Sequence, residues 1–314
     1  MIDLDEEQEG LVIAPEFVAT DAPKVTVVMT VLNGAAYLAE AMQSVLSQTY
    51  RNIELVVVND GSTDTTADII ESFFEKFEEE CLVLIKHETP QGISRSRNQA
   101  IKQATGDFIC VLDGDDYFSL TYVEEMVALA KTYPLAGAIV ANYCNFVGSD
   151  VREPHFTTCP QLQALLSEAG HPHSLEIDSE EATRILAAEN FSSACTSFFR
   201  RSALAKVGFY KESLRACEDF HLMFRVGTHF PLVVSTNVGM YRRLHHNNMS
   251  SESLHMARNY CASRFDLLWR HALPEVRWEL RGRAEQYRGN YFFLALKKMS
   301  IIDIARALLY YSPL

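Results

Sequence analysis

Three aspartates occupy four positions directly behind an apolar run in the stretch CVLDGDDYFS. Because the side-chain period of a strand is two, Asp113 and Asp115 point to the same side, where their charges create a strong negative potential. Mg²⁺ or Mn²⁺ would relieve that potential, since both prefer oxygen ligands and also bind phosphate oxygens. The alternative is a turn before a helix, with Asp115 or Asp116 as its cap. The stretch therefore indicates either a metal–phosphate site or a capped turn.

A second carboxylate follows an apolar run in VVVNDGSTD. Asp60 stands where it can accept hydrogen bonds from a ribose hydroxyl or from the N–H of a base. Turn chemistry accounts for the same residues, with Gly61 at an unusual φ and Ser62, Thr63 or Asp64 as the cap of the next helix. The two interpretations are compatible, so the stretch predicts a capped turn that can also hold a nucleoside.

Two arginines begin a predicted helix in GISRSRNQA. Arg95 and Arg97 lie at the end of the helix macrodipole that cations ordinarily avoid. A bound anion would explain the placement, because guanidinium groups and helix N–H groups both favour phosphate. The alternative is an exposed arginine without a special role.

Two later segments complete the set of candidates. Glu218 and Asp219 open a predicted helix in ACEDFHL, where acids either complement the helix dipole or supply a general base to the reacting centre. His245 and His246 follow in the polar turn of YRRLHHNNMS, and such a pair belongs either to the surface or to a ligand set. No one of these stretches identifies the reaction by itself, but the order and spacing of all of them along the chain do.

The hydrophobic pattern predicts the elements that must position these residues. Strands are predicted at 25–33, 53–60, 81–88, 107–113 and 136–146, and helices at 37–49, 65–80, 92–106 and 121–133. This alternation predicts βαβ units and an α/β fold with a doubly wound, mostly parallel sheet flanked by helices. Ligands of such sheets bind beyond the carboxyl ends of the strands. Three polar clusters stand at those ends: Thr30 and Asn33, Asn59 and Asp60, and Asp113 and Asp115.

Composition excludes several classes of protein. The net charge of −13 and the lack of a Lys/Arg run with interleaved aromatics argue against nucleic-acid binding. Seven cysteines, far apart and without a C-x-x-C pair, indicate a reducing compartment rather than a disulfide scaffold or a zinc site. No stretch approaches 18 uninterrupted apolar residues, and the acidic N-terminus is unlike a signal peptide. A cytoplasmic protein is expected, with at most peripheral contact to the inner face of the membrane.

In combination, the quoted stretches resemble the family 2 glycosyltransferases, enzymes of the GT-A fold. The resemblance covers roughly residues 24–250 and adds VTVVMTVLNGAAYLAEAMQSVLSQTYRNIELVVVND and TGDFICVLDGDDYF to the motifs above. It implies an inverting transferase that moves a sugar from a nucleotide-sugar, most often a UDP-sugar, to a hydroxyl of a glycan or lipid-linked acceptor. Surface polysaccharide biosynthesis is the implied setting, and Mn²⁺ or Mg²⁺ is the implied cofactor.

The resemblance also assigns roles to individual residues. The implied nucleotide-sugar site comprises Thr30, Asn33, Asp60, Arg97, Asp113 and Glu218. Among these, Asp60 would contact the base, Asp113 the ribose, and Arg97 the diphosphate. Asp219 is implied as the catalytic base, and Asp115 with His245 as the metal ligands. The family often has Tyr-Arg-x-His where this chain has YRRLHH, so His246 remains an alternative to His245.

Other functions with a similar sheet fit the sequence less well. A dehydrogenase needs G-x-G-x-x-G after the first strand, which VLNGAAYL lacks. An aspartyl phosphatase would carry its D-x-D on the first strand. A nucleotidylyltransferase normally opens with a Gly-rich basic loop, which is absent here. A catalytically silent sugar-nucleotide-binding or scaffold protein remains the alternative, although the intact D-x-D and Glu-Asp pairs argue against it.

Domain boundaries follow from changes in composition. Residues 1–22 carry seven acids and no base and are expected to form a mobile acidic leader. A GT-A catalytic domain is expected at 23–250, with a nucleotide-binding half at 23–150 and an acceptor-binding half at 151–250. Periodicity weakens between 150 and 190, which indicates a loop-rich insertion. A helical extension is expected at 251–314, where basic residues beside apolar ones suggest either membrane contact or a homo-oligomer.

Overall fold

The computed structural model describes residues 22–74, 82–246, 248, 253–268, 273–298 and 300–309. The strands are β1 (Val25–Val31), β2 (Ile53–Asn59), β3 (Leu82–Lys86), β4 (Phe108–Asp113), β5 (Tyr117–Phe118), β6 (Ala138–Val147), β7 (Asp150–Pro154), β8 (Ser174–Ile177), β9 (Ser197–Arg200) and β10 (Leu232–Arg243). The α-helices are α1 (Leu38–Leu46), α2 (Thr66–Phe74), α3 (Ile93–Gln103), α4 (Tyr122–Thr132), α5 (Pro160–Glu168), α6 (Ser179–Ala188), α7 (Arg201–Val207), α8 (Glu218–His229), α9 (Ser253–Leu268), α10 (Pro274–Lys297) and α11 (Ile301–Leu309). The 3₁₀ turns in the described part of the chain are η2 (His155–Thr158) and η3 (Ala194–Thr196).

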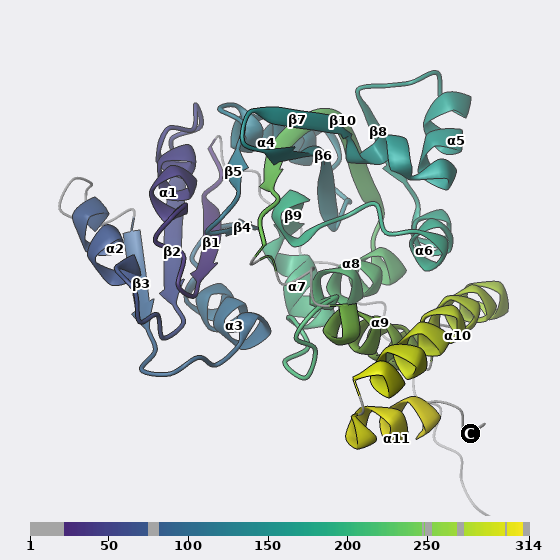
Figure 1. Cartoon of the computed structure of the whole chain (residues 1–314). Coiled ribbons are helices and arrows are strands. Elements are labelled where there is room, and N and C mark those ends of the chain that lie inside the picture. The colour runs from purple at the N-terminus through teal and green to yellow at the C-terminus, as the bar shows by residue number, and fades with distance from the viewer. Residues whose placement is uncertain are drawn as a thin grey trace, which may run out of the picture.

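These strands form one sheet in the order β3-β2-β1-β4-β9-β6-β10-β5, with β7 paired to β6 and β8 to β10 (Figure 1). The pairs around β1 are parallel, and so is the pair of β6 and β10. Strand β9 runs antiparallel to both of its neighbours, β4 and β6. Two successive reversals restore the original direction, so β10 ends at the same edge of the sheet as β1, β2 and β4. The prediction of a mostly parallel α/β sheet is confirmed.

Apolar β-branched sequence explains the inner strands. Every residue of β1 is buried, as expected for a strand covered on both faces. Helix α3 packs against β1 and β2, while α4 packs against β6 and β10. The strands predicted from periodicity each coincide with β1, β2, β3, β4 or β6, although the predicted helix at 65–80 runs into residues outside the described ones.

The prediction of a loop-rich segment between 150 and 190 is wrong. This segment contains β7, α5, β8 and α6, joined by short turns. Its helices and strands are short, so the apolar residues show neither the helical nor the strand period over enough positions to be recognised. The signals that mark them are local: Pro160 is the first residue of α5, and Asp178 accepts the N–H of Glu181 as the cap of α6.

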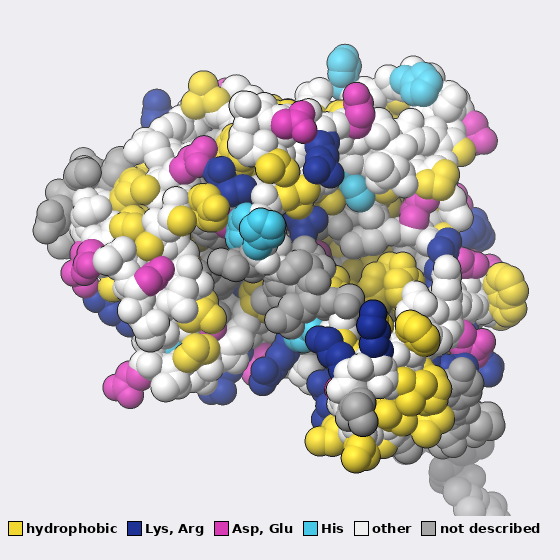
Figure 2. All heavy atoms as spheres, in the orientation of Figure 1, with side chains coloured by type: hydrophobic (Ala, Val, Ile, Leu, Met, Phe, Trp, Pro, Cys, Tyr) yellow, Lys and Arg dark blue, Asp and Glu magenta, His cyan; other side chains and the backbone are white. Residues whose placement is uncertain are grey.

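The C-terminal helices form a separate layer beside the sheet. Helix α9 packs against α8, α10 packs against α9 and α6, and α11 packs against α10. Hydrophobic side chains gather over α11 and the C-terminal end of α10, in the lower part of the view, with Lys and Arg side chains beside them (Figure 2). Among the described residues, no helix has the length and apolar content needed to cross a membrane.

Candidate active site

The Asp113–Asp116 turn lies at the carboxyl end of β4. Asp116 donates its N–H to the carbonyl of Asp113 at 3.2 Å, and β5 begins immediately afterwards. The alternative of a helix cap at Asp115 or Asp116 is therefore wrong, because the next helix starts only at Tyr122. The turn instead holds three carboxylates at the sheet edge where ligands bind in α/β folds.

Asp115 contacts His245, which lies in the turn after β10. Oδ2 of Asp115 lies 2.9 Å from Nε2 of His245 and accepts a hydrogen bond from Nδ2 of Asn248 at 3.3 Å. Burial raises the pKa of Asp115, the charge of Asp113 adds to the effect, and His245 opposes it. His246 is exposed. The structure thus brings His245, the first of the two candidate histidines, to Asp115.

Strand β10 delivers this histidine turn through an irregular path. Its register against β6 shifts twice between Ser235 and Met240, and such bulges re-aim the residues that follow. Arg243 at its end donates its N–H to Oδ1 of Asp116 and its Nε–H to the carbonyl of Asp115, at 2.9 and 3.0 Å. Arg243 was missed by sequence reasoning, although it stands in the quoted stretch YRRLHH. It fixes the Asp113–Asp116 turn to β10.

Arg97 links two acidic groups inside the protein. Its side chain is 1% exposed, and its two terminal nitrogens lie 2.5 Å from Asp113 and 2.6 Å from Glu218. Burial acts to lower the pKa of Arg97, but the two carboxylates outweigh it and raise that pKa. Both terminal nitrogens of Arg97 are paired with these carboxylates, so the expected contact of Arg97 with a diphosphate stays a prediction.

The acidic pair opens α8 beside this link. Cys217 adopts a left-handed conformation, with φ of 58°, and turns the chain into the helix at Glu218. Glu218 is buried, and burial raises its pKa while Arg97 opposes the shift and Asp219 adds to it. Asp219 is half-buried and accepts the N–H of Phe220 at 2.7 Å. Of the pair, Glu218 is thus the anchored acid and Asp219 the more accessible one.

Asp60 is anchored behind the end of β2. Its two oxygens accept N–H groups of Gln91 and Gly92 at 2.8 and 2.9 Å, and Nδ1 of His87 lies 2.6 Å away. Burial acts to raise the pKa of Asp60, but these hydrogen bonds outweigh it and lower that pKa, so the carboxylate is charged. Gly61 has φ of +81°, and a Cβ there would lie 2.8 Å from the backbone of Pro90, which explains the glycine.

Thr30 and Asn33 lie at the end of β1. Asn33, with φ of 53°, accepts the N–H of Thr63 at 2.8 Å and donates its own N–H to Ser62 at 2.9 Å. Oγ1 of Thr30 is buried and finds no hydrogen-bond partner among the described residues. An orphaned hydroxyl at this edge of the sheet is a group that a polar ligand could satisfy.

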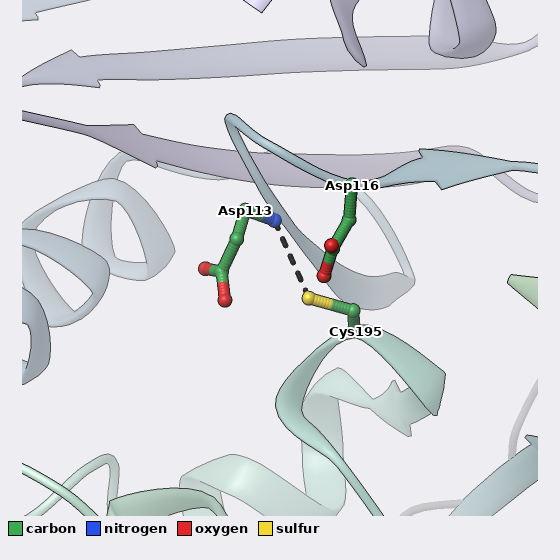
Figure 3. A group of neighbouring side chains, drawn as sticks. All are labelled: Asp113, Asp116 and Cys195. Carbon is green, nitrogen blue, oxygen red and sulfur yellow. Dashed lines mark hydrogen bonds between the residues drawn. The ribbon is translucent and has the colours of Figure 1, made fainter. Parts of the chain in front are cut away.

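A second group of possible metal ligands lies next to the same turn. One ligand atom from each of Asp113, Asp116 and Cys195 falls within 4.8 Å of the others (Figure 3). Sγ of Cys195 accepts the N–H of Asp113 at 3.3 Å, and burial raises the pKa of the thiol well above its usual range. A protonated thiol is a poor ligand for a hard cation. Asp115 and His245 therefore offer the better donor set for Mg²⁺ or Mn²⁺.

Comparison with known proteins connects this geometry to a family. The family model of glycosyl transferase family 2 matches residues 26–208, more than half of the chain. Glycosyltransferase GlyA of Streptococcus pneumoniae is 36% identical over 127 residues, which are 40% of this chain and 18% of GlyA. An uncharacterized glycosyltransferase of Rickettsia prowazekii, RP339, is 26% identical over 239 residues, which are 76% of this chain and 70% of that protein.

Solved structures share the fold at low sequence identity. S. aureus TarS 1–349, determined in complex with UDP-GlcNAc, aligns with a TM-score of 0.70 and 21% identity over 91% of this chain and 79% of its own. The mannosyltransferase PcManGT from Pyrobaculum calidifontis, determined with GDP-Man and Mn²⁺, aligns with a TM-score of 0.64 and 18% identity over 92% of this chain and 75% of its own. The sheet is therefore that of the GT-A fold, and the chain belongs to glycosyl transferase family 2.

Proposed function

We propose that this chain transfers a sugar from a UDP-sugar to a hydroxyl of a glycan or lipid-linked acceptor, with inversion at the anomeric carbon. The observation that carries the proposal is the contact of Asp115 with His245, together with the link that Arg97 makes between Asp113 and Glu218, the neighbour of Asp219. These residues come from β4 and the turn after it, the turn after β10, α8 and α3. They supply the acidic, basic and metal-binding groups that glycosyl transfer requires.

The residues fit a divalent cation of the Mg²⁺ or Mn²⁺ type. Asp115 and His245 would hold it, because their donor atoms already lie 2.9 Å apart at a partly exposed edge. When bound, such a cation supplies positive charge that stabilises a departing nucleoside diphosphate. The complex of PcManGT with Mn²⁺ supports this choice of metal.

For the donor, we assign Asp60 and Asn33 to the nucleoside and Thr30 to a polar group of the ligand. The orphaned hydroxyl of Thr30 and the charged, fixed carboxylate of Asp60 support this assignment. Asp113 would accept a hydrogen bond from the ribose, with its carboxylate oriented by Arg97. TarS was determined with UDP and with UDP-GlcNAc, which supports uridine as the nucleoside.

For the chemical step, Asp219 would accept the proton of the acceptor hydroxyl. The hydroxyl oxygen then attacks the anomeric carbon on the face opposite the departing diphosphate, and this single displacement inverts the configuration. Glu218 would hold Asp219 in place, because its own carboxylate is fixed to the buried guanidinium of Arg97 at 2.6 Å. Residues 23–150 would bind the donor and residues 151–250 the acceptor. The reaction would take place in the cytoplasm, as a step in the biosynthesis of a surface polysaccharide.

The test is release of UDP from a panel of UDP-sugars, with and without Mn²⁺, and with GDP-mannose as the comparison donor. Metal-dependent release from at least one UDP-sugar is expected, with loss on chelation by EDTA. Release from GDP-mannose alone would overturn the choice of uridine. Thermal stabilisation by UDP and Mn²⁺ without turnover of any donor would instead favour the catalytically silent binding protein.

A further inference from the structure

Helix α11 presents three of its aliphatic side chains to solvent. Ile301 and Ile302 are 81% and 66% exposed, and Leu308 is 52% exposed. The opposite side of the helix packs on α10 through Ala307, which is buried, and Asp303, which accepts hydrogen bonds from Tyr291 at 2.7 Å and Ser300 at 2.6 Å. A surface helix ordinarily buries its apolar face and exposes its acids. On α11 three aliphatic side chains are exposed instead, while the acid, Asp303, bonds to Tyr291 of α10.

The end of α10 also exposes apolar side chains. Phe293 and Leu296 are 66% and 47% exposed and stand three positions apart, so they share one side of the helix. With Ile301, Ile302 and Leu308 they make up an exposed patch, called here the terminal patch. Exposed apolar side chains gathered at one place mark an interaction site on a folded protein. Figure 2 shows hydrophobic side chains gathered over these two elements.

Basic side chains border the terminal patch. Lys297 and Lys298 are exposed at the end of α10, and Arg306 is exposed on α11. Residues 251–314 carry ten Lys and Arg against six Asp and Glu, although the whole chain has a net charge of −13. The excess of cationic charge thus lies in the same C-terminal segment as the terminal patch. An anionic partner with an apolar layer beneath its charges would complement both features.

We propose that the terminal patch docks the protein on the surface of an anionic lipid bilayer. Helix α11 would lie in the interface with Ile301 and Ile302 among the acyl chains, while Lys297 and Lys298 contact the lipid phosphates. A second copy of the chain fits less well, since a two-fold interface would bring the lysines of both copies together. Five apolar side chains are also few beside the roughly 20–30 residues a side of a stable interface.

This inference does not rest on the proposed transfer reaction. It is tested by flotation of the full chain with vesicles of phosphatidylcholine, alone or mixed with phosphatidylglycerol, at low and high salt. Binding to the mixed vesicles at low salt is expected, with loss at high salt. Failure of the wild-type chain to float with the mixed vesicles would overturn the proposal.

Variants separate the two components of the binding. Ile301→Glu with Ile302→Glu is expected to weaken partitioning by at least about tenfold, because it places charge in the acyl layer. Leu135→Glu is the matched control, since Leu135 is 74% exposed in the turn after α4, and it should bind like the wild type. Equal binding by the Ile301 and Ile302 variant would contradict the proposal.

The charge component is tested by Lys297→Glu with Lys298→Glu, which should remove the preference for phosphatidylglycerol. Arg152→Glu with Arg201→Glu makes the same change in net charge at exposed residues of β7 and α7 and should leave the preference intact. Size-exclusion chromatography with light scattering accompanies both experiments. A dimer that dissociates on the Ile301 and Ile302 substitutions, with no vesicle binding, would assign the terminal patch to a second copy instead.

Discussion

Nε2 of His245 lies 2.9 Å from Oδ2 of Asp115, although 130 positions separate the two residues in the chain. The contact depends on β10, which runs parallel to β6 and ends at the edge where β4 ends. Arg243 then holds the two chain segments together through the backbone of Asp115. Asp115, in the turn after β4, is thus joined by a histidine from the turn after β10, a strand that is not a neighbour of β4 in the sheet.

The first prediction concerns this pair. His245→Ala and Asp115→Ala should each weaken the metal-dependent binding of UDP by more than about tenfold, because each removes a ligand of the proposed cation. Titration calorimetry with UDP, with and without Mn²⁺, measures the effect. His246→Ala is the matched control, since His246 is exposed one position further along. An equal loss in the control would contradict the assignment of His245.

The second prediction separates chemistry from donor binding. Asp219→Asn should lower the rate of transfer by about 10²–10⁴, because an amide cannot accept the proton of the acceptor hydroxyl. Binding of UDP with Mn²⁺ should remain close to that of the wild type. Asp150→Asn removes an exposed carboxylate from β7 and should change neither quantity. Transfer at the wild-type rate in the Asp219 variant would refute its role as the base.

The third prediction concerns the buried guanidinium. Arg97→Met should lower the free energy of unfolding by roughly 3–5 kcal/mol, because it leaves the carboxylates of Asp113 and Glu218 without their shared cation. Urea denaturation followed by circular dichroism measures the change. Arg95→Met, two positions earlier and exposed, should stay within about 0.5 kcal/mol of the wild type. Similar stability in the two variants would show that the link is dispensable for folding.

The fourth prediction is a pH dependence of stability that involves a different histidine. His221 is buried in α8, with Nε2 2.8 Å from Oδ2 of Asp266. Burial lowers its pKa from 6.5 to about 4, although Asp266 opposes the shift. Between these two values the unfolded chain holds a proton on this imidazole that the folded chain does not. Stability from this residue is therefore complete above pH 6.5 and is lost as the pH falls toward 4.

The expected slope from His221 is up to about 1.4 kcal/mol per pH unit. Urea denaturation at several pH values measures it, with His221→Gln as the reference, because glutamine keeps an N–H for Asp266 but does not titrate. The wild type should lose more stability on acidification than the variant. Parallel pH curves for the two proteins would contradict a neutral, buried His221.

Much of the fold followed from local pattern. Runs such as VTVVMTV predict a buried strand because β-branched residues repeat without polar interruption, and β1 occupies those residues. The positions of Asp60 and Asp113 at strand ends followed in turn. The antiparallel insertion of β9 between β4 and β6 did not, because strand order depends on contacts between distant segments that periodicity does not encode.

The sequence identified candidate residues for the site, but it did not identify the contacts between them. Arg97 was expected at a phosphate because its position near the start of α3 is visible in sequence, whereas its enclosure depends on Glu218, which lies 121 positions away. Cys195 and Arg243 carried no signal of their own type or spacing. Their roles are visible only in their contacts. Cys195 accepts the backbone N–H of Asp113, and Arg243 bonds to the Asp113–Asp116 turn.

The span between Asp115 and His245 also sets an order of events during folding. Closing a contact across most of a domain costs more chain entropy than closing the neighbouring turns, so it forms after them. Strands β1 to β4 can pair while β10 is still being synthesised, yet such a nascent chain has Asp115 without its histidine. The proposed pair of metal ligands, Asp115 and His245, is therefore complete only after β10 has joined the sheet.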